Sequence, residues 1–398
     1  MDLADRIAKL CLDKYASIKN TGKPNEKEWT VLSGIVLENH LNELFIISLC
    51  TGTKCLGSVE LRSTKYEDRG SRLSDSHAEI LARRALLRYL YYQIELLLRS
   101  NSSDVFYFEK EQIKLKEVSF HFFSSQTPCG DCSIIPKFQE NPVDFSILPK
   151  KMKKHEQNDF KPIFGFQITD IYRTGAKCIE TDTKQDLHGN GVNYHTVGPL
   201  RTKPGRGDRT LSLSCSDKIA KWNIMGVQGA LLSLMIPVIH LKTIVIGGQC
   251  PYSLESMQRG IFKRFGVDGI VPNIIQSKLS FEQRKGGSRI RPCPSSIVWC
   301  ATPEKSIEIA VEGLKQGATK KRKKLCRLLI SRKELFKTFI KVYDIFQRNK
   351  ESTRHPKKLT YYIFKCYSVT YQQLWNDTLK FIPMWPVKSI YLLECLNF

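Results

Sequence analysis

Residues 75–79 read Asp-Ser-His-Ala-Glu, and residues 128–132 read Pro-Cys-Gly-Asp-Cys. The first motif supplies an imidazole at His77 and a carboxylate at Glu79, and the second supplies two thiols. Imidazole and thiolate are preferred zinc ligands, and a catalytic zinc site keeps one position open for water. Either motif alone is also consistent with a histidine at a helix start or with buried thiols. Together and in this order they indicate a catalytic zinc site.

His-x-Glu followed by Pro-Cys-x-x-Cys is typical of zinc-dependent nucleobase deaminases. Bound zinc lowers the pKa of its water towards about 7, which makes hydroxide available at neutral pH. Glu79 stands two residues from His77, so we expect it to shuttle a proton from that water to a ring nitrogen and then to the departing ammonia. Pro128 directly precedes Cys129, and we expect a helix to begin there with its free N–H groups aimed at the thiolate.

Composition limits the class of protein. The chain has 398 residues, is 41% hydrophobic and contains no evident linker, so we expect one large domain over residues 1–398 or two tightly fused lobes. A formal charge of +23 favours a polyanionic partner, and RNA or DNA over a membrane, because no lipidation motif or anchor helix is present. The longest apolar stretch, 229–241, is too short to cross a bilayer. Thirteen cysteines without framework spacing fit a reducing, intracellular compartment, nuclear or cytoplasmic.

Helical and strand periodicities alternate along the chain. They predict helices over 1–18 and 77–98, a hairpin of 29–38 with 41–50, and strands over 118–126 and 242–248. This alternation predicts an α/β sandwich. Residues 149–161 are basic and polar, and we expect them to form an exposed insertion. Residues 189–209 are rich in Gly, Pro and Arg, which predicts a loop near a substrate phosphate.

Three segments carry a resemblance to a known family. They are DSHAEILARRALLRYL (75–90), TPCGDC (127–132) and LSLSCSDKIAKWNIMGVQGALLS (211–233). They resemble the catalytic domain of the RNA-editing adenosine deaminases, and within that family the tRNA-specific members. The resemblance covers nearly the whole chain. It implies a cytidine-deaminase-like α/β sandwich, with a central mixed sheet flanked by helices and a C-terminal helical portion, in a single editase domain.

The third zinc ligand has two candidates, Cys132 and Cys215. Spacing favours Cys132, because C-x-x-C is a common zinc arrangement. The resemblance favours Cys215, because the family takes its second cysteine ligand from the matching Ser-Cys-Ser-Asp-Lys segment and usually has alanine at the position of Cys132. It therefore implies His77, Cys129 and Cys215 as ligands, with Cys132 as the alternative.

Several cations stand in otherwise apolar helical sequence, among them Arg83 and Arg84. Buried cations are costly unless they are paired, although each one alone also fits a surface residue with a buried stem. By resemblance they match positions around a buried inositol hexakisphosphate. The full set is Arg83, Arg84, Ser212, Lys218, Lys221, Arg327, Tyr361, Lys365 and Tyr371, with Trp222 and Trp385 nearby. The resemblance also implies that Asp75 and Lys218 link this site to the zinc centre.

The resemblance implies that adenosine is converted to inosine in the anticodon loop of a tRNA, at adenosine 37 of alanine tRNA. It makes Thr53 and Lys54 candidate RNA contacts. Arg206 is another, because its flanking glycines permit close approach to a base or a phosphate. Basic runs at 150–154 and 320–324 either add nonspecific RNA affinity or are solvated charges. We expect no obligate protein partner.

Other functions remain open from the sequence. The same chemistry can act on structured mRNA or on cytidine in RNA, although the chain has no room for a double-stranded-RNA-binding domain. A noncatalytic, zinc-bearing RNA-binding protein is the third possibility. Glu79 argues against it, because a structural zinc has no use for that carboxylate.

Overall fold

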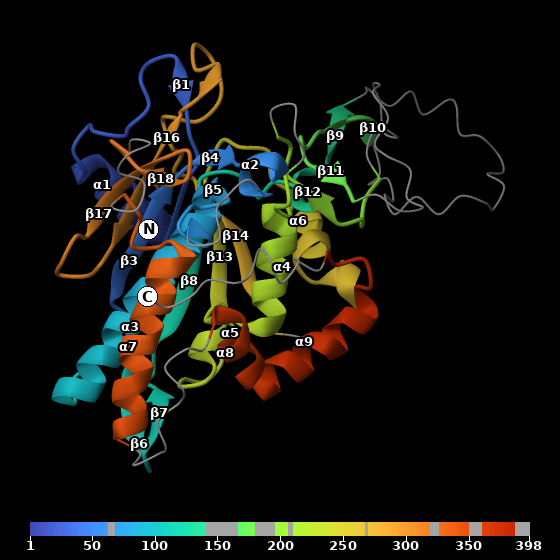
Figure 1. Cartoon of the computed structure of the whole chain (residues 1–398). Coiled ribbons are helices and arrows are strands. Elements are labelled where there is room, and N and C mark those ends of the chain that lie inside the picture. Colours follow the sequence, from blue (N-terminus) through green and yellow to red (C-terminus); the bar gives the residue numbers. More distant parts are fainter. Residues whose placement is uncertain are drawn as a thin grey trace.

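A mixed eight-stranded sheet forms the centre of the molecule (Figure 1). The computed structural model describes residues 1–62, 68–140, 166–179, 196–205, 210–266, 270–318, 326–349 and 360–386. The strand order is β14-β13-β8-β2-β3-β16-β17-β18. These strands are β2 (Leu32–Glu38), β3 (Leu44–Thr51), β8 (Ser119–Ser124), β13 (Leu241–Ile246), β14 (Asn273–Gln276), β16 (Ser295–Cys300), β17 (Ile307–Val311) and β18 (Leu314–Lys315). Strands β14, β13 and β8 run parallel, and the remaining neighbours pair antiparallel.

Helices and short strand pairs surround this sheet. The helices are α1 (Leu3–Ser17), α2 (Ser58–Arg62), α3 (Ala78–Ser100), α4 (Cys215–Met225), α5 (Gly229–Leu232), α6 (Leu254–Ile261), α7 (Arg332–Arg348), α8 (Tyr361–Tyr367) and α9 (Val369–Phe381), with 3-10 turns η2 (Asp131–Ser133) and η4 (Lys263–Phe265). The pairs are β1 (Glu28–Trp29) with β15 (Arg291–Pro292), β4 (Thr53–Cys55) with β5 (Asp75–His77), β6 (Phe106–Glu109) with β7 (Gln112–Leu115), β9 (Ile135–Glu140) with β10 (Phe166–Tyr172), and β11 (Lys177–Cys178) with β12 (Arg201–Thr202).

Side chains alternate between the two faces along each strand, and each face packs against its own hydrophobic core. On β2, Val36 packs with α1 on one face, whereas Ile35 and Leu37 join the larger core against α3 on the other. On β8, Phe123 and Phe122 divide between the same two cores. Burial on both faces explains why these strands are nearly continuous runs of apolar residues.

The expected elements match the structure closely. The hairpin is β2–β3, the helix after His77 is α3, and the strands are β8 and β13. Helix α1 begins where the Asp2 side chain accepts a hydrogen bond from the Asp5 amide at 2.9 Å. The predicted fold class, an α/β sandwich with a mixed sheet and a C-terminal helical portion, is confirmed.

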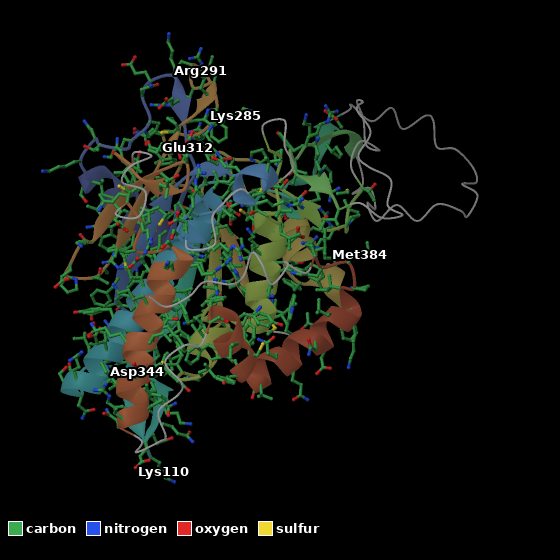
Figure 2. All side chains as sticks on the ribbon, in the orientation of Figure 1. Lys110, Lys285, Arg291, Glu312, Asp344 and Met384 are labelled. Atoms are coloured by element: carbon green, nitrogen blue, oxygen red, sulfur yellow. The ribbon has the colours of Figure 1, made fainter. Side chains whose placement is uncertain are left out.

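The structure bears on the predictions about basic residues, cysteines and membrane helices only for the described residues. Lys285 and Arg291 lie at one end of the molecule and Lys110 at the other, so cations are present at both ends (Figure 2). The insertion at 149–161 and the basic run at 320–324 lie outside the described residues. Every cysteine in the described part of the chain is free. None of the described helices is long and apolar enough to cross a membrane.

An aromatic cluster joins α7 to α8. The Phe339 ring is fully buried, with its centroid 5.1 Å from those of both Tyr343 and Phe364. Truncating such a ring removes its burial and leaves a cavity. We therefore expect Phe339→Ala to lower the free energy of unfolding by about 3–5 kcal/mol in denaturant titrations. The matched control is Phe381→Ala on α9, where the side chain is 61% exposed and the expected change is below about 0.5 kcal/mol. Equal losses in the two variants would contradict this packing.

Candidate active site

Three distant segments meet beside the carboxyl end of strand β8. His77 is the last residue of β5 and directly precedes α3, Cys129 follows β8 by five residues, and Cys215 is the first residue of α4. Ligand crevices of sheets with parallel strands lie at this end of the strands. The fold thus brings together residues that are 52 and 138 positions apart in the sequence.

The geometry of these three side chains fits a metal ion. Their ligand atoms all lie within 4.8 Å of one another. His77 Nδ1 is 3.9 Å from Cys129 Sγ and 3.6 Å from Cys215 Sγ. In a tetrahedral zinc site, a nitrogen and a sulfur ligand stand about 3.6 Å apart. The donor set of one imidazole and two thiols is also the set that zinc prefers.

Glu79 lies on the first turn of α3 and is 3% exposed. Burial raises the pKa of its carboxyl group above the usual value. Its Oε2 atom has no hydrogen-bond partner among the described residues. A buried carboxylate oxygen without a protein partner suits a group that handles the proton of a bound water.

The start of α4, rather than a helix after Pro128, faces the Cys129 thiolate. The amide of Cys215 donates to Cys129 Sγ at 3.4 Å, and contact with the Cys215 side chain holds the pKa of the Cys129 thiol well below its usual value. The helix predicted after Pro128 was wrong: only the 3-10 turn η2 forms there. Gly130 explains this, because its positive φ of 102° is incompatible with a helix that begins at Cys129, and the chain continues through η2 into β9.

Cys132 lies outside the group of three. Its side chain is fully buried, and its Sγ is 3.9 Å from the carbonyl oxygen of Met257 on α6. Burial raises the pKa of this thiol to about 12. A protonated thiol that packs against α6 behaves as a small apolar side chain. The spacing argument for Cys132 therefore has no support in the geometry.

Asp75 is paired with two lysines. Lys218 Nζ on α4 lies 2.5 Å from Asp75 Oδ2, and Lys203 Nζ lies 2.7 and 2.9 Å from its two oxygens. Burial alone would raise the pKa of Asp75, but the two lysines lower it overall. The resemblance implies a role for Lys218 but not for Lys203. Lys203 is buried, stands 128 positions from Asp75 in the sequence and belongs to no motif. Lys203 belongs to the segment 189–209, so the described part of that segment contributes a buried cation beside the candidate ligands.

The sequence of this chain matches a known domain family. The profile of the adenosine-deaminase (editase) domain matches residues 48–389. The chain belongs to the adenosine-deaminase (editase) family. The resemblance found in the sequence is thereby confirmed.

Individual members of this deaminase family differ in how much of their length matches. The tRNA-specific adenosine deaminase 1 of Mus musculus is 35% identical over 94% of this chain and 95% of its own length. That of Drosophila melanogaster is 36% identical over 98% and 95%. The double-stranded RNA-specific editase of Drosophila melanogaster is 33% identical over 68% of this chain but only 37% of its own length. The tRNA-specific deaminases therefore match from end to end, and the editase in part.

The residues that the resemblance assigns to an inositol phosphate site lie on or next to α3, α4, α7, α8 and α9. Arg84 Nε donates to the Ile330 carbonyl at 2.6 Å, and burial together with nearby Arg332 lowers the pKa of the Arg84 guanidinium to about 10. Arg83 lies over the Trp222 ring at 5.4 Å. Lys221 Nζ lies 3.2 Å from the ring centre of Trp375 and 5.4 Å from that of Trp385. Arg327 Nη1 lies 3.6 Å from a carboxylate oxygen of Glu334, and Ser212 is buried. Tyr361 and Lys365 are on α8, and Tyr371 is on α9.

The RNA-contact candidates have different outcomes. Thr53 and Lys54 lie on β4, where Thr53 pairs with His77 and Lys54 with Ser76. Side chains of directly opposed residues share a face of the sheet. Thr53 is thus placed beside a candidate ligand. Arg206 lies outside the described residues.

Proposed function

We propose that this protein hydrolytically deaminates adenosine to inosine in the anticodon loop of a tRNA, with adenosine 37 of alanine tRNA as the position. The observation that carries this proposal is the grouping of His77, Cys129 and Cys215 beside the buried, unpaired Glu79 oxygen. The end-to-end similarity to tRNA-specific deaminases supports tRNA as the substrate. The net charge of +23 favours a polyanion of this kind.

In this proposal His77, Cys129 and Cys215 hold a catalytic zinc. When bound, zinc supplies a Lewis acid that activates water at neutral pH. Glu79 accepts one proton from the attacking water and delivers it to a ring nitrogen. It then takes the second proton of that water from the new C6 hydroxyl and delivers it to the leaving amine, so that adenosine and water become inosine and ammonia. The burial of Glu79 keeps bulk water away from this transfer.

The first test is inosine formation on unmodified tRNA transcripts. We expect the purified protein to produce an adenosine-to-guanosine read change at position 37, just 3′ of the anticodon, when the product is sequenced. A cytidine-to-uridine change instead, or inosine only in a duplex mRNA substrate, would favour the alternative functions. Silence from a folded, zinc-loaded preparation on every tRNA would contradict the proposal.

We further propose that the cation cluster binds inositol hexakisphosphate as part of the fold. Arg83, Arg84, Lys218, Lys221, Arg327 and Lys365 supply charge, and Ser212, Tyr361 and Tyr371 supply hydroxyl groups. The support is physical: Arg83, Arg84 and Arg332 stand close together, and their mutual proximity and burial disfavour the charged forms unless an anion is present.

This proposal predicts a releasable anion. We expect acid denaturation of the purified protein to free about one equivalent of inositol hexakisphosphate, detected by mass spectrometry, because a ligand bound only to the folded state leaves on unfolding. Arg84→Gln should lower the yield of folded protein. The control is Arg348→Gln, on the exposed end of α7. Folded, active protein that releases no polyphosphate would overturn the assignment.

The domain and contact assignments follow the same proposal. We propose one deaminase domain over residues 1–398, and the basic stretch 149–161 lies outside the described residues. Thr53, Lys54 and Arg206 contact the RNA, and the protein acts inside the cell without an obligate protein partner. The contact assignment is tested with Lys54→Ala, which we expect to bind the isolated anticodon stem-loop more weakly than the wild-type protein does.

A further inference from the structure

Each proposed cysteine ligand is followed two residues later by a buried aspartate. Asp131 follows Cys129 and Asp217 follows Cys215, and both carboxylates have 0% relative exposure. Carboxylates at such depth require cationic partners and further hydrogen bonds. The nearest cationic partners come from α6 and from η4, and Arg201 Nη1 lies farther away, 4.0 Å from Asp131 Oδ1.

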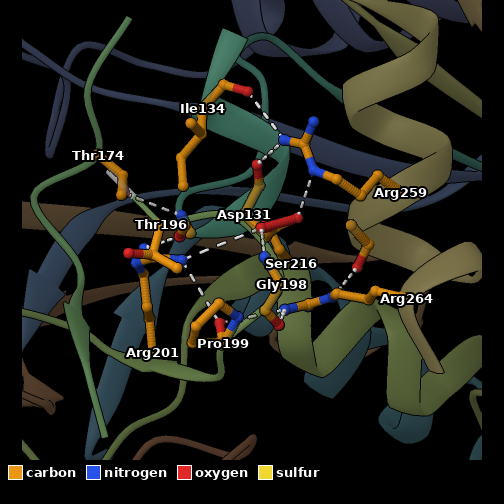
Figure 3. Close-up of polar contacts among 12 residues, drawn as sticks. Asp131, Ile134, Thr174, Thr196, Gly198, Pro199, Arg201, Ser216, Arg259 and Arg264 are labelled. Atoms are coloured by element: carbon orange, nitrogen blue, oxygen red, sulfur yellow. Dashed lines mark hydrogen bonds and ion pairs between the residues drawn. The ribbon is translucent and has the colours of Figure 1, made fainter. Parts of the chain in front are cut away.

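Arg259, on α6, binds the turn that carries Cys129. Its Nε donates to Asp131 Oδ2 at 2.9 Å, and its Nη2 donates to the carbonyl oxygens of Asp131 at 2.9 Å and Ile134 at 2.8 Å (Figure 3). The guanidinium therefore binds the side chain and carbonyl of the first residue of η2 and the carbonyl of Ile134, which directly follows η2. A planar fork of this kind is specific to arginine.

Arg264, in η4, binds the first turn of α4 in a similar way. Its Nη2 donates to Asp217 Oδ1 at 2.5 Å. The other oxygen of Asp217 accepts from Ser214 Oγ at 2.7 Å, which caps the helix that begins at Cys215. The side chain of Arg264 is 4% exposed, so water screens this ion pair little.

The two aspartates also hold one shared segment between them. Asp131 Oδ1 accepts from the Gly198 amide at 2.8 Å, and Asp217 Oδ2 accepts from the Arg201 amide at 3.0 Å. Arg264 Nη1 adds a bond to the Gly198 carbonyl at 3.2 Å (Figure 3). This segment leads directly to Lys203, which binds Asp75. The network thus ties both cysteine turns to the strand that ends at His77.

Close packing leaves little slack between these elements. A Cβ atom on Gly260 would lie 2.4 Å from Cys132 Sγ, so α6 sits directly against η2. Ser216 Oγ donates to the Cys129 carbonyl at 2.9 Å and accepts from the Cys132 amide at 3.1 Å. A shift of α6 must therefore move the turn that carries Cys129.

We propose that Arg259 and Arg264 are positioning residues for the zinc centre, which hold Cys129 and Cys215 at the separation that the metal requires. The proposal rests on the proposed function, because it takes these two cysteines as ligands. Neither arginine lies in the three segments that carry the resemblance (75–90, 127–132 and 211–233), and each acts on its cysteine through the aspartate two residues further on. Loss of an outer-shell partner typically weakens metal binding about 10- to 100-fold.

The experiment compares Arg259→Gln and Arg264→Gln with the wild-type protein and with Arg88→Gln. Arg88 lies on α3, nine residues beyond Glu79. It is the matched control, because its guanidinium also binds backbone carbonyls, those of Lys305 at 2.9 Å and Glu304 at 2.6 Å. Zinc release to a chromogenic chelator gives the rate of metal loss. The visible spectrum of the cobalt(II)-substituted protein reports the geometry of the thiolate ligands. Thermal unfolding in chelator reports the stability of the metal-free fold.

We expect zinc loss about 10- to 100-fold faster in the two variants, with shifted cobalt bands, and neither change in Arg88→Gln. Arg264→Lys should retain zinc better than Arg264→Gln but less well than wild type, because lysine keeps the positive charge but lacks the planar fork of hydrogen-bond donors. If Arg264→Gln does not fold, the double variant Asp217→Asn/Arg264→Gln leaves no unpaired buried charge and should still lose zinc rapidly.

Two outcomes separate this inference from the proposed function. Wild-type zinc release and wild-type cobalt bands in Arg259→Gln and Arg264→Gln, or in the double variant, would overturn the positioning role and leave the proposed function intact. A wild-type protein that binds neither zinc nor cobalt would overturn both, because the ligand assignment itself would fail.

Discussion

Replacing Glu79 with Gln is expected to lower the deamination rate by about 10²- to 10⁴-fold, the range in which general acid–base catalysis contributes. Glutamine keeps the size and burial of the side chain but cannot accept and return a proton. Because Glu79 is not one of the three grouped donors His77, Cys129 and Cys215, zinc content and tRNA affinity should stay close to wild type. Single-turnover inosine formation, metal analysis and a tRNA filter-binding assay measure the three quantities.

The control for this variant is Glu95→Gln, on the same helix. Glu95 forms surface ion pairs at 2.8 Å with Arg99 and Lys341, and such pairs contribute little to stability. It should deaminate at the wild-type rate. A Glu79→Gln protein that still turns over within about tenfold of wild type would rule out Glu79 as the proton shuttle.

Cys215→Ala is expected to abolish zinc binding and activity, whereas Cys132→Ala should retain both. The first variant removes one of three grouped donors, and the loss should exceed the 10- to 100-fold typical of an outer-shell change. The second removes a thiol that packs against α6, so it should only lower stability, by about 1 kcal/mol. Zinc stoichiometry by atomic absorption after dialysis distinguishes the two.

The paired design makes the result decisive for the third ligand. Each cysteine serves as the control for the other, because both are fully buried. Zinc loss in Cys132→Ala with zinc retained in Cys215→Ala would reverse the assignment and restore the spacing argument.

Local periodicity predicted much of this fold. Strands β2, β3, β8 and β13 and helices α1 and α3 each bury a face that is visible in the sequence as an apolar pattern. The helix predicted after Pro128 was wrong, because Gly130 adopts a positive φ of 102° and only a 3-10 turn follows it.

The candidate site was predictable only where a motif or a resemblance marks it. His77, Glu79 and Cys129 follow from their motifs, and Cys215 from the family resemblance. The roles of Lys203, Arg259 and Arg264 did not follow from the sequence, because each depends on a carboxylate 47 to 128 residues away. Such pairings are set by the tertiary fold, and single-sequence patterns do not encode them.

The separation of the ligands along the chain has a consequence for biosynthesis. His77 and Cys215 are 138 residues apart, and ribosomes add about 5–20 residues per second. About 7 to 28 seconds therefore pass between the synthesis of the first ligand and the last. During this interval the nascent chain exposes His77 and the Cys129 thiol without the residue that completes the site. In the zinc site that we propose, the full set of donors therefore exists only after Cys215 has been synthesised, so binding by all three residues is a late event.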